Sequence, residues 1–240
     1  MKWTPVVSYG GGVNSVAMLL LMIDQGIEFQ HVIFSDTKGE KPGTYDYNAM
    51  FSDYLKEKGH PGITRISRSG SLYDDCMKQK RLPGIAYGFK SCSENWKRKP
   101  FVQYCIKNDL FPVINYKGID AGEPSRQRSD RELRERIIYP LVEADMDRED
   151  CKAYILKHGL PLPPKSACFF CPASSPADVR SLSPELQKAA IKMERNQIQK
   201  PNSTIKGLGF RHRWEDWLTV QELPFPETKE PCRISCDCNL

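Results

Sequence analysis

Residues 8–15 read Ser8-Tyr9-Gly10-Gly11-Gly12-Val13-Asn14-Ser15 and separate two apolar runs. The run before them, Trp3 to Val7, has the pattern of a strand, and the run after them, Val16 to Ile23, has that of a buried helix face. Three consecutive glycines permit positive φ and let backbone N–H groups approach an anion. The helix adds the amides of its first turn and the positive end of its dipole. The stretch therefore predicts a phosphate-binding turn in an α/β protein, with an ordinary glycine-rich turn as the alternative.

Three kinds of phosphate-binding loop can be compared with this stretch. A P-loop requires a lysine after its last glycine, and none follows here. The dinucleotide fingerprint fits at Gly10 and Gly12, with Asp36 near the position of a ribose-binding acid, but Ser15 replaces its third glycine. The stretch resembles the PP-loop of the ATP pyrophosphatase superfamily, Ser-Gly-Gly-x-Asp-Ser, with Ser8 and Ser15 as its hydroxyl ends. Asn14 stands where most of that superfamily has aspartate, which removes one negative charge beside the phosphates.

Length and composition indicate one α/β domain with an appendage. The chain has 240 residues, 40% of them hydrophobic, and a net charge of +5. No stretch approaches the ~20 apolar residues of a membrane helix. Met1-Lys2-Trp3 leads directly into the first strand without a signal peptide, and nine cysteines in such a chain are typical of reduced thiols. We therefore expect a soluble cytoplasmic protein with no membrane partner.

Strands and helices alternate along the chain, a pattern that predicts a parallel, twisted sheet with helices on both faces. Expected strands cover residues 3–7, 31–35, 63–66 and 112–116, and expected helices cover residues 16–23, 44–58, 94–107 and 184–199. The loops that begin at Ser8, Asp36 and Gly118 would meet at the carboxyl edge of this sheet. We expect a nucleotide-binding α/β domain over residues 1–165 and a Cys-rich, helical C-terminal segment over residues 166–240, packed over the site.

Several motifs at the expected strand ends resemble one family. Residues 36–45, Asp-Thr-Lys-Gly-Glu-Lys-Pro-Gly-Thr-Tyr, resemble the Asp-Thr-Gly-x-Glu-x-Pro-x-Thr-Tyr segment of the phosphoadenosine phosphosulfate (PAPS) reductase family. Residues 118–126, Gly-Ile-Asp-Ala-Gly-Glu-Pro-Ser-Arg, are similar to its Gly-Ile-x-Ala-x-Glu-x-x-Arg stretch. Tyr139-Pro140-Leu141 and the helix to His158 resemble its later half, and the closest likeness is to small, phage-type members. The resemblance implies an adenine nucleotide alpha hydrolase-like fold.

The resemblance also implies a set of site residues. The nucleotide would lie against Ser8, Tyr9, Gly10, Gly11, Gly12, Asn14, Ser15, Asp36, Thr37, Gly118 and Glu123. We interpret Asp36 as a ribose or metal contact rather than a turn cap. Arg126 is interpreted as a phosphate contact rather than the partner of Glu123, because a planar guanidinium suits phosphate oxygens. The basic cluster over residues 78–99 fits either a rim for a polyanionic substrate or a solvated helix face, and Lys97 within it is the second candidate catalytic cation.

The cysteines suggest a metal centre. Cys168 and Cys171 form a Cys-x-x-Cys turn, and Cys232, Cys236 and Cys238 lie in the last nine residues. Cluster-bearing adenylyl sulfate reductases have a tandem Cys-Cys where this chain has Ser91-Cys92, so the resemblance implies Cys92, Cys168 and Cys171 as ligands, with Cys232 as a candidate fourth. A [4Fe-4S] cluster, zinc and metal-free thiols all stay open. A cluster predicts a brown protein on anaerobic purification, whereas a colourless protein with stoichiometric zinc would exclude it.

Three functions remain open from the sequence. In the first, ATP with Mg²⁺ lies on the PP-loop, an acceptor attacks the α-phosphorus, and a thiolate or cluster-borne sulfide then displaces AMP in sulfur transfer. In the second, PAPS or adenylyl sulfate is reduced by Cys236 or Cys238. In the third, the chain binds nucleic acid through basic groups and exposed Trp214 and Trp217, with structural zinc, although these tryptophans also fit a packed helix face. The acceptor is open, with nucleic acid one candidate, and so is the formation of a homodimer.

Overall fold

The computed structural model describes residues 2–86, 89–127, 134–198 and 205–219. These residues group into two compact units, one of residues 2–68 and 93–166 and the other of residues 69–92 and 167–219. The expected division fell between residues 165 and 166, and it did not anticipate that residues 69–92 group with the later part of the chain. The packing of a C-terminal segment over the site stays a prediction.

The first unit is built on a five-stranded sheet in which all neighbouring strands run parallel. The strands are β1 (Thr4–Tyr9), β2 (His31–Asp36), β3 (Ile63–Ser67), β6 (Val113–Lys117) and β7 (Glu135–Ile138). They lie in the order β3-β2-β1-β6-β7, so β1 is central. β1 and β2 are rich in β-branched and aromatic residues and are almost entirely buried, as expected of central parallel strands. The predicted parallel α/β fold is confirmed.

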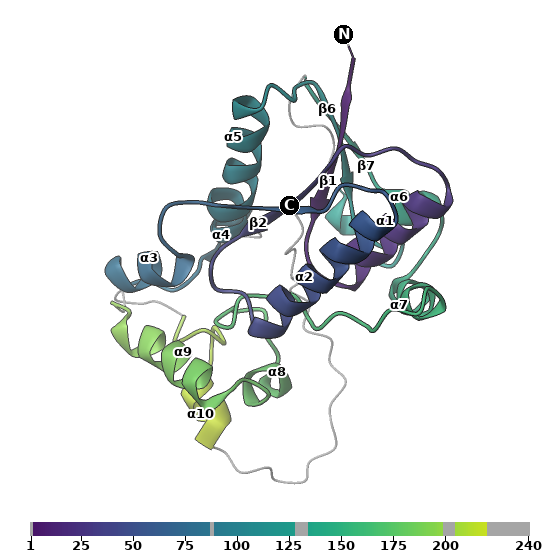
Figure 1. Cartoon of the computed structure of the whole chain (residues 1–240). Helices are drawn as coiled ribbons and strands as arrows, with labels where there is room; N and C mark the ends of the chain where they lie inside the picture. The colour runs from purple at the N-terminus through teal and green to yellow at the C-terminus, as the bar shows by residue number, and fades with distance from the viewer. Residues whose placement is uncertain (1, 87–88, 128–133, 199–204, 220–240) are drawn as a thin grey trace. The chain divides into compact units, whose positions relative to one another are not determined.

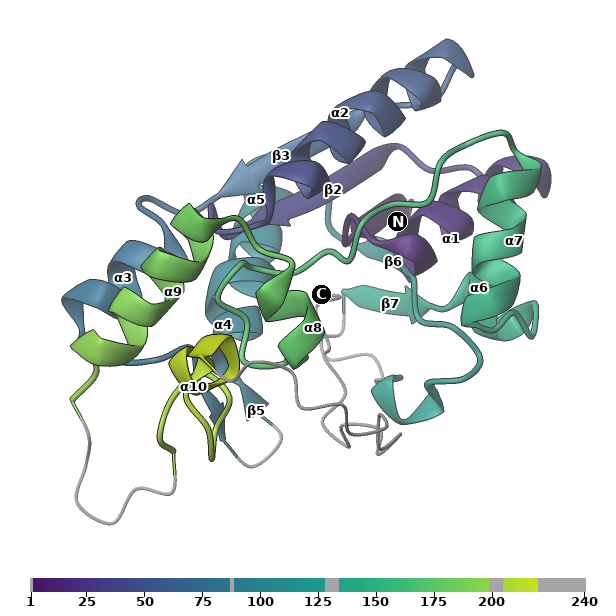
Figure 2. The same ribbon diagram turned by 90° about the horizontal axis from the view of Figure 1, so that it is seen from below.

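Helices cover both faces of this sheet (Figures 1 and 2). One face carries α1 (Val13–Asp24), α2 (Pro42–Glu57), α6 (Pro140–Glu143) and α7 (Arg148–Lys157). The other carries α5 (Lys99–Lys107), which continues from the π-helical turn η1 (Glu94–Arg98). The 3₁₀ turn η2 (Pro124–Arg126) belongs to the first unit, and the short helix α4 (Ser91–Ser93) lies where the chain passes from the second unit to the first.

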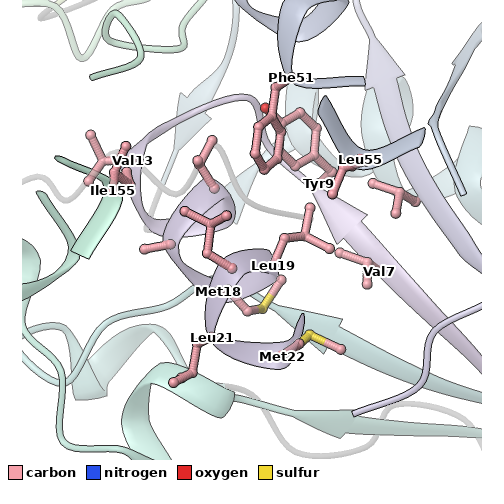
Figure 3. Close-up of a cluster of buried hydrophobic side chains, with 14 of the residues drawn as sticks. Val7, Tyr9, Val13, Met18, Leu19, Leu21, Met22, Phe51, Leu55 and Ile155 are labelled. Atoms are coloured by element: carbon pink, nitrogen blue, oxygen red, sulfur yellow. The ribbon is translucent and has the colours of Figure 1, made fainter. Parts of the chain in front are cut away.

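The alternation of side chains along β1 divides the core between the two faces. Val7 and Tyr9 pack with the helices α1, α2 and α7, and Figure 3 shows this cluster around Met18, Leu19 and Phe51. Val6 points the other way, into the smaller cluster around α5. Helix α1 is apolar on nearly all sides and is buried from Val13 to Met22, which fits a helix enclosed in the interior.

The second unit contains four helices and one antiparallel strand pair within the described residues. These elements are α3 (Leu72–Lys78), β4 (Ile85–Ala86), β5 (Phe89–Lys90), α8 (Pro176–Arg180), α9 (Pro184–Asn196) and α10 (Trp214–Thr219). The buried carboxylate of Glu194 accepts hydrogen bonds from the amides of Leu208, at 2.6 Å, and Trp214, at 2.9 Å, and so caps α10. Burial raises the pKa of Glu194.

The tryptophans of α10 do not form an exposed platform. Trp214 is fully buried, and its ring stacks on that of Trp217, which is half-buried, with 6.4 Å between the ring centroids. The interpretation of Trp214 as an exposed base-stacking residue is therefore wrong, and the packed helix face is what the structure shows. His212 is exposed. No helix in the described part of the chain is long and apolar enough to cross a membrane.

Three cysteine thiols are predicted to resist alkylation in the native protein. Cys76, Cys105 and Cys151 are at most 1% exposed, and burial raises the pKa of each thiol to about 12. Because the thiolate is the reacting species, iodoacetamide at pH 8 should leave these three unmodified while it labels more exposed cysteines. Peptide mass spectrometry, with the urea-unfolded protein as control, checks this. Native labelling of all three at the unfolded rate would contradict the described burial.

Candidate functional site

The candidate site lies at the carboxyl edge of the sheet, beside the central strand. The chain runs outward from β1 to β2 and β3, and then returns to the other side of β1 to form β6 and β7. The strand order therefore reverses between β1 and β6, and ligands of open α/β sheets bind at such a point. β1, β2 and β6 are neighbours, so the loops that follow Tyr9, Asp36 and Lys117 begin at one edge, as predicted.

The turn formed by Gly10, Gly11 and Gly12, called the glycine turn below, has the local geometry of an anion-binding site. Gly11 has φ of +76°, a conformation that side chains disfavour, and Gly12 is the extended N-cap of α1. The hydroxyl of Ser15 donates to the carbonyl oxygen of Gly12 at 2.9 Å and accepts from the Gly12 amide at 3.2 Å. A glycine cap has no side chain to accept from the amides of residues 13–15, and helix geometry gives these amides no intrahelical acceptor. Ser15 thus shapes the turn through its side chain, and the amides of the first turn are the candidate phosphate donors.

Two polar side chains of α2 lie beside this turn. Thr44 is fully buried and Asn48 is 7% exposed. A Cβ built on Gly11 would lie 3.1 Å from Asn48 Oδ1 and 3.2 Å from Thr44 Cγ2. Within the described residues, the Thr44 hydroxyl and both amide atoms of Asn48 are buried without a hydrogen-bond partner. Buried polar atoms in native proteins are nearly always satisfied, so these atoms indicate a missing ligand group or water. The sequence analysis missed both residues, although Thr44 belongs to a quoted motif.

Asn14 is held by a carboxylate from the loop after β6. Its Nδ2 donates to Asp120 Oδ2 at 2.7 Å, and its Oδ1 accepts from Arg148 at 3.5 Å. Asn14 and Asp120 are both at least 95% buried. The turn thus has a negative charge beside it from Asp120, a residue that the sequence analysis did not select.

Asp36 is engaged within the chain. Its Oδ1 accepts from the Lys38 amide at 2.7 Å and from the Tyr45 hydroxyl at 2.9 Å, and its Oδ2 accepts from Arg65 Nε at 2.7 Å. The Arg65 guanidinium also stacks on the Tyr45 ring at 4.5 Å. Burial, with the Asp36 contact as the next cause, raises the pKa of Tyr45. The Lys38 contact is the turn cap that was weighed as the alternative, and a ribose or metal contact for Asp36 stays a prediction.

The turn η1 brings two buried cations to the same unit. Lys97 is 6% exposed and lies 3.5 Å from Glu40, and Arg98 is 9% exposed and lies 3.0 Å from Glu135. The sequence analysis predicted Lys97 and missed Arg98. A third buried cation, Lys117, ends β6 in register with Ser8 of β1 and was also missed. Its position as the last residue of a strand next to Gly118 is the signal that could have identified it.

Other predicted residues have different surroundings from those expected. Tyr9 points into the core, where its ring lies 6.0 Å from that of Phe51, so only its backbone can face a ligand. The Ser8 hydroxyl donates to Asn115 at 2.8 Å. Arg126 forms an ion pair with Glu123, the pairing that was set aside in favour of a phosphate contact. Thr37 is buried beside Asp36.

Gly118, in the loop after β6, lies close against the backbone of the first turn of α1. A Cβ at this position would lie 2.8 Å from the Ser15 nitrogen and 2.9 Å from the Asn14 carbonyl carbon. Gly118 therefore belongs to the site as a backbone contact, since no side chain fits there.

The described residues do not assemble the predicted metal centre. Cys92, Cys168 and Cys171 all belong to the second unit, and the Cys171 amide donates to the Cys168 carbonyl in a turn. Among the residues the structure describes, no three or more His, Cys, Asp or Glu side chains are arranged to hold a metal ion. Cys232, Cys236 and Cys238 lie outside the described residues. The cluster, zinc and Mg²⁺ stay predictions.

Comparison with known proteins finds a likeness to solved structures but none to a known sequence family. No protein-family model and no curated protein match the chain. Among solved structures, it is similar to phosphoadenylyl-sulfate (PAPS) reductase from Candida auris, solved as a phosphate complex. The similarity covers 67% of this chain and 74% of that chain, with a TM-score of 0.45 and 17% identity.

Replacement of Asn14 by aspartate should destabilise the first unit. The variant Asn14→Asp places a second buried carboxylate against Asp120, and we expect it to lower the free energy of unfolding by about 2–4 kcal/mol at pH 8. Because like charges raise the pKa of a carboxyl, the loss should shrink as the pH falls and one group is protonated. Urea unfolding at pH 8 and pH 5 measures both effects.

The double variant N14D/D120N is the matched control. It exchanges the carboxylate and the amide without a change in total charge, and it should recover most of the lost stability. A single variant as stable as the native protein would show that Asn14 and Asp120 do not interact as described.

Proposed function

We propose that the glycine turn of the first unit binds the phosphates of an adenine nucleotide. The observation that carries this proposal is the start of α1, at the point of strand-order reversal, where a glycine cap leaves the amides of residues 13–15 without an acceptor among the described residues. α1 has 12 residues, so the aligned peptide dipoles add a positive potential at this end.

The surroundings of the turn favour a ligand over an ordinary structural turn. Thr44 and Asn48 bring to the side of Gly11 three buried polar atoms that have no partner among the described residues, and such atoms are usually satisfied by a ligand group or by water. The Ser166 hydroxyl donates to the Gly10 carbonyl, which holds the turn from its other side. The turn is thus fixed by contacts while hydrogen-bonding groups around it remain unused.

The adenine nucleotide and the reaction come from the motif resemblance. Residues 36–45 and 118–126 resemble segments of the PAPS reductase family, and both follow strands that flank β1. We propose that an acceptor oxygen forms a bond to the α-phosphorus of ATP while the bond from that phosphorus to the bridging oxygen breaks. Pyrophosphate leaves, the acceptor becomes adenylated, and the acceptor proton passes to solvent. With water as acceptor, the products are AMP and pyrophosphate.

The residues of this chain would act by position and charge. Amides of residues 13–15 would hold phosphate oxygens, and Lys97, Arg126 and Lys117 are the cations placed in the same unit. Such electrostatic stabilisation supplies most of the acceleration in phosphoryl chemistry. Displacement of AMP by a thiolate would follow adenylation, whereas reduction of PAPS by Cys236 or Cys238 is an alternative reaction on the same site, and Cys236 and Cys238 lie outside the described part of the chain.

Removal of a single main-chain donor tests the site. Val13 is the first residue of α1, a position that accepts proline without loss of the helix. Val13→Pro deletes one N–H group, whereas Val13→Ala keeps it and trims the side chain. We expect Val13→Pro to bind ATP about tenfold more weakly than Val13→Ala, since a hydrogen bond to a charged group is worth about 1.5 kcal/mol. Titration calorimetry measures the two affinities.

The native protein supplies the reference for this comparison. ATP should raise its melting temperature more than AMP does, because the proposed donors face phosphates, and a parallel titration with PAPS separates the two nucleotide classes. Slow release of AMP and pyrophosphate, rather than ADP and phosphate, would show that the bond between the α- and β-phosphates is cleaved. No stabilisation by ATP, AMP or PAPS would overturn the proposal.

A further inference from the structure

A buried series of hydrogen bonds, called the hydrogen-bond chain below, joins the strands β7, β6 and β1 and ends at Ser8, just before the glycine turn. The Ser8 hydroxyl of β1 donates to Asn115 Oδ1 of β6 at 2.8 Å. Asn115 Nδ2 donates to Glu135 Oε1 of β7 at 2.8 Å, and the Arg98 guanidinium lies 3.0 Å from Glu135 Oε2. Ser8, Asn115 and Glu135 are each at most 2% exposed, and Arg98 is 9% exposed.

The chemistry of the groups fixes the direction of every hydrogen bond in this chain. An ionised carboxylate only accepts, so Asn115 must turn its NH₂ group toward Glu135. The carbonyl oxygen of Asn115 must then face Ser8. Because that oxygen only accepts, the Ser8 hydroxyl has to be the donor. The proton of Ser8 is thereby committed to Asn115, and only its lone pairs remain for other contacts.

We infer that Glu135 and Asn115 are positioning residues for the glycine turn, and that they hold Ser8 as a hydrogen-bond acceptor rather than as a donor to phosphate. Ser8 lies two residues before Gly10, so its link to Asn115 fixes the end of β1 from which the turn departs. This inference rests on the proposed function of the turn. It reassigns Ser8, which the motif resemblance placed among the nucleotide contacts.

The burial of an ion pair supports a positioning role. Removal of charges from water is costly, and apolar residues of similar volume are often at least as stable in such places. A chain with a defined direction fixes geometry in a way that apolar packing does not. Arg98 supplies the counter-charge from η1, so the π-helical turn contributes to the same arrangement.

An exchange of the amide and the carboxylate tests the chain. Glu135→Gln replaces a carboxylate, which only accepts, by an amide. The new amide would turn its oxygen to Arg98 and its NH₂ group to Asn115. Asn115 would then turn its own NH₂ group to Ser8, so every hydrogen bond would reverse and Ser8 would accept from Asn115. Asn115→Asp instead sets two carboxylates against each other. The double variant N115D/E135Q keeps the total charge, and Ser8 again donates to an oxygen. Each single variant should therefore disturb the turn, and the double variant should restore it.

Hydrogen exchange of the amides in residues 9–16, measured without nucleotide, is the first readout, and ATP affinity is the second. We expect N115D to exchange faster and to bind ATP about tenfold more weakly, with most of both effects recovered in the double variant. Val113→Ala is the matched control: Val113 lies opposite Glu135 in the β6–β7 register, and its truncation removes buried volume but no hydrogen-bonding group of Ser8, Asn115 or Glu135. It should lower the melting temperature and leave both readouts near native values.

The outcomes separate this inference from the proposed function. If the double variant exchanges as fast as N115D, or if Val113→Ala disturbs the turn equally, the positioning role is wrong. If the native protein binds no nucleotide, the proposed function fails. The exchange measurements still decide whether Glu135 and Asn115 hold the turn.

Discussion

The backbone at residue 118 lies against the first turn of α1 at a distance that only glycine permits. A Cβ there would lie less than 3 Å from backbone atoms of Asn14 and Ser15, which cannot move aside as a flexible side chain could. Any side chain would separate the exit of β6 from the helix start, and Asp120 would lose its contact with Asn14. The glycine turn, the carboxylate of Asp120 and the amides of α1 depend on this approach for their relative positions.

Local patterns were sufficient to predict much of the first unit. β1, β2 and β6 were expected because each is a short, largely apolar run, and β3 was expected from the β-branched residues Ile63, Thr64 and Ile66. β7 was not, since Glu135-Arg136-Ile137-Ile138 carries two charges in four residues. Glu135 is buried because Arg98, from a distant turn, neutralises it. The grouping of α3 with α9 was equally hidden, as it depends on contacts such as Asn196 to the Met77 carbonyl.

The candidate site likewise has features that follow from neighbouring residues in the sequence and features that depend on contacts between distant residues. The turn could be predicted because glycine conformations and helix starts are properties of neighbouring residues. The inward direction of the Tyr9 side chain could also be predicted from the sequence, because successive side chains of a strand alternate between its faces and Tyr9 therefore shares a face with Val7. The partners of Asp36 could not be predicted in this way. Arg65 contacts Asp36 only because the strand register sets Asp36 opposite Ser67 on β3.

Charge pairing explains why phosphate recognition should rest on the backbone. Lys97 and Arg98 each lie against a buried glutamate, so much of their charge is cancelled before a ligand arrives. A phosphate that approached them would compete with those carboxylates. The amides at the start of α1 form no ion pair that a phosphate would have to displace, and their dipoles are already aligned, although the Asp120 carboxylate lies beside the turn. In the proposed function, the paired cations would hold the strands and loops in place, while the main chain would provide the first contacts with the anion.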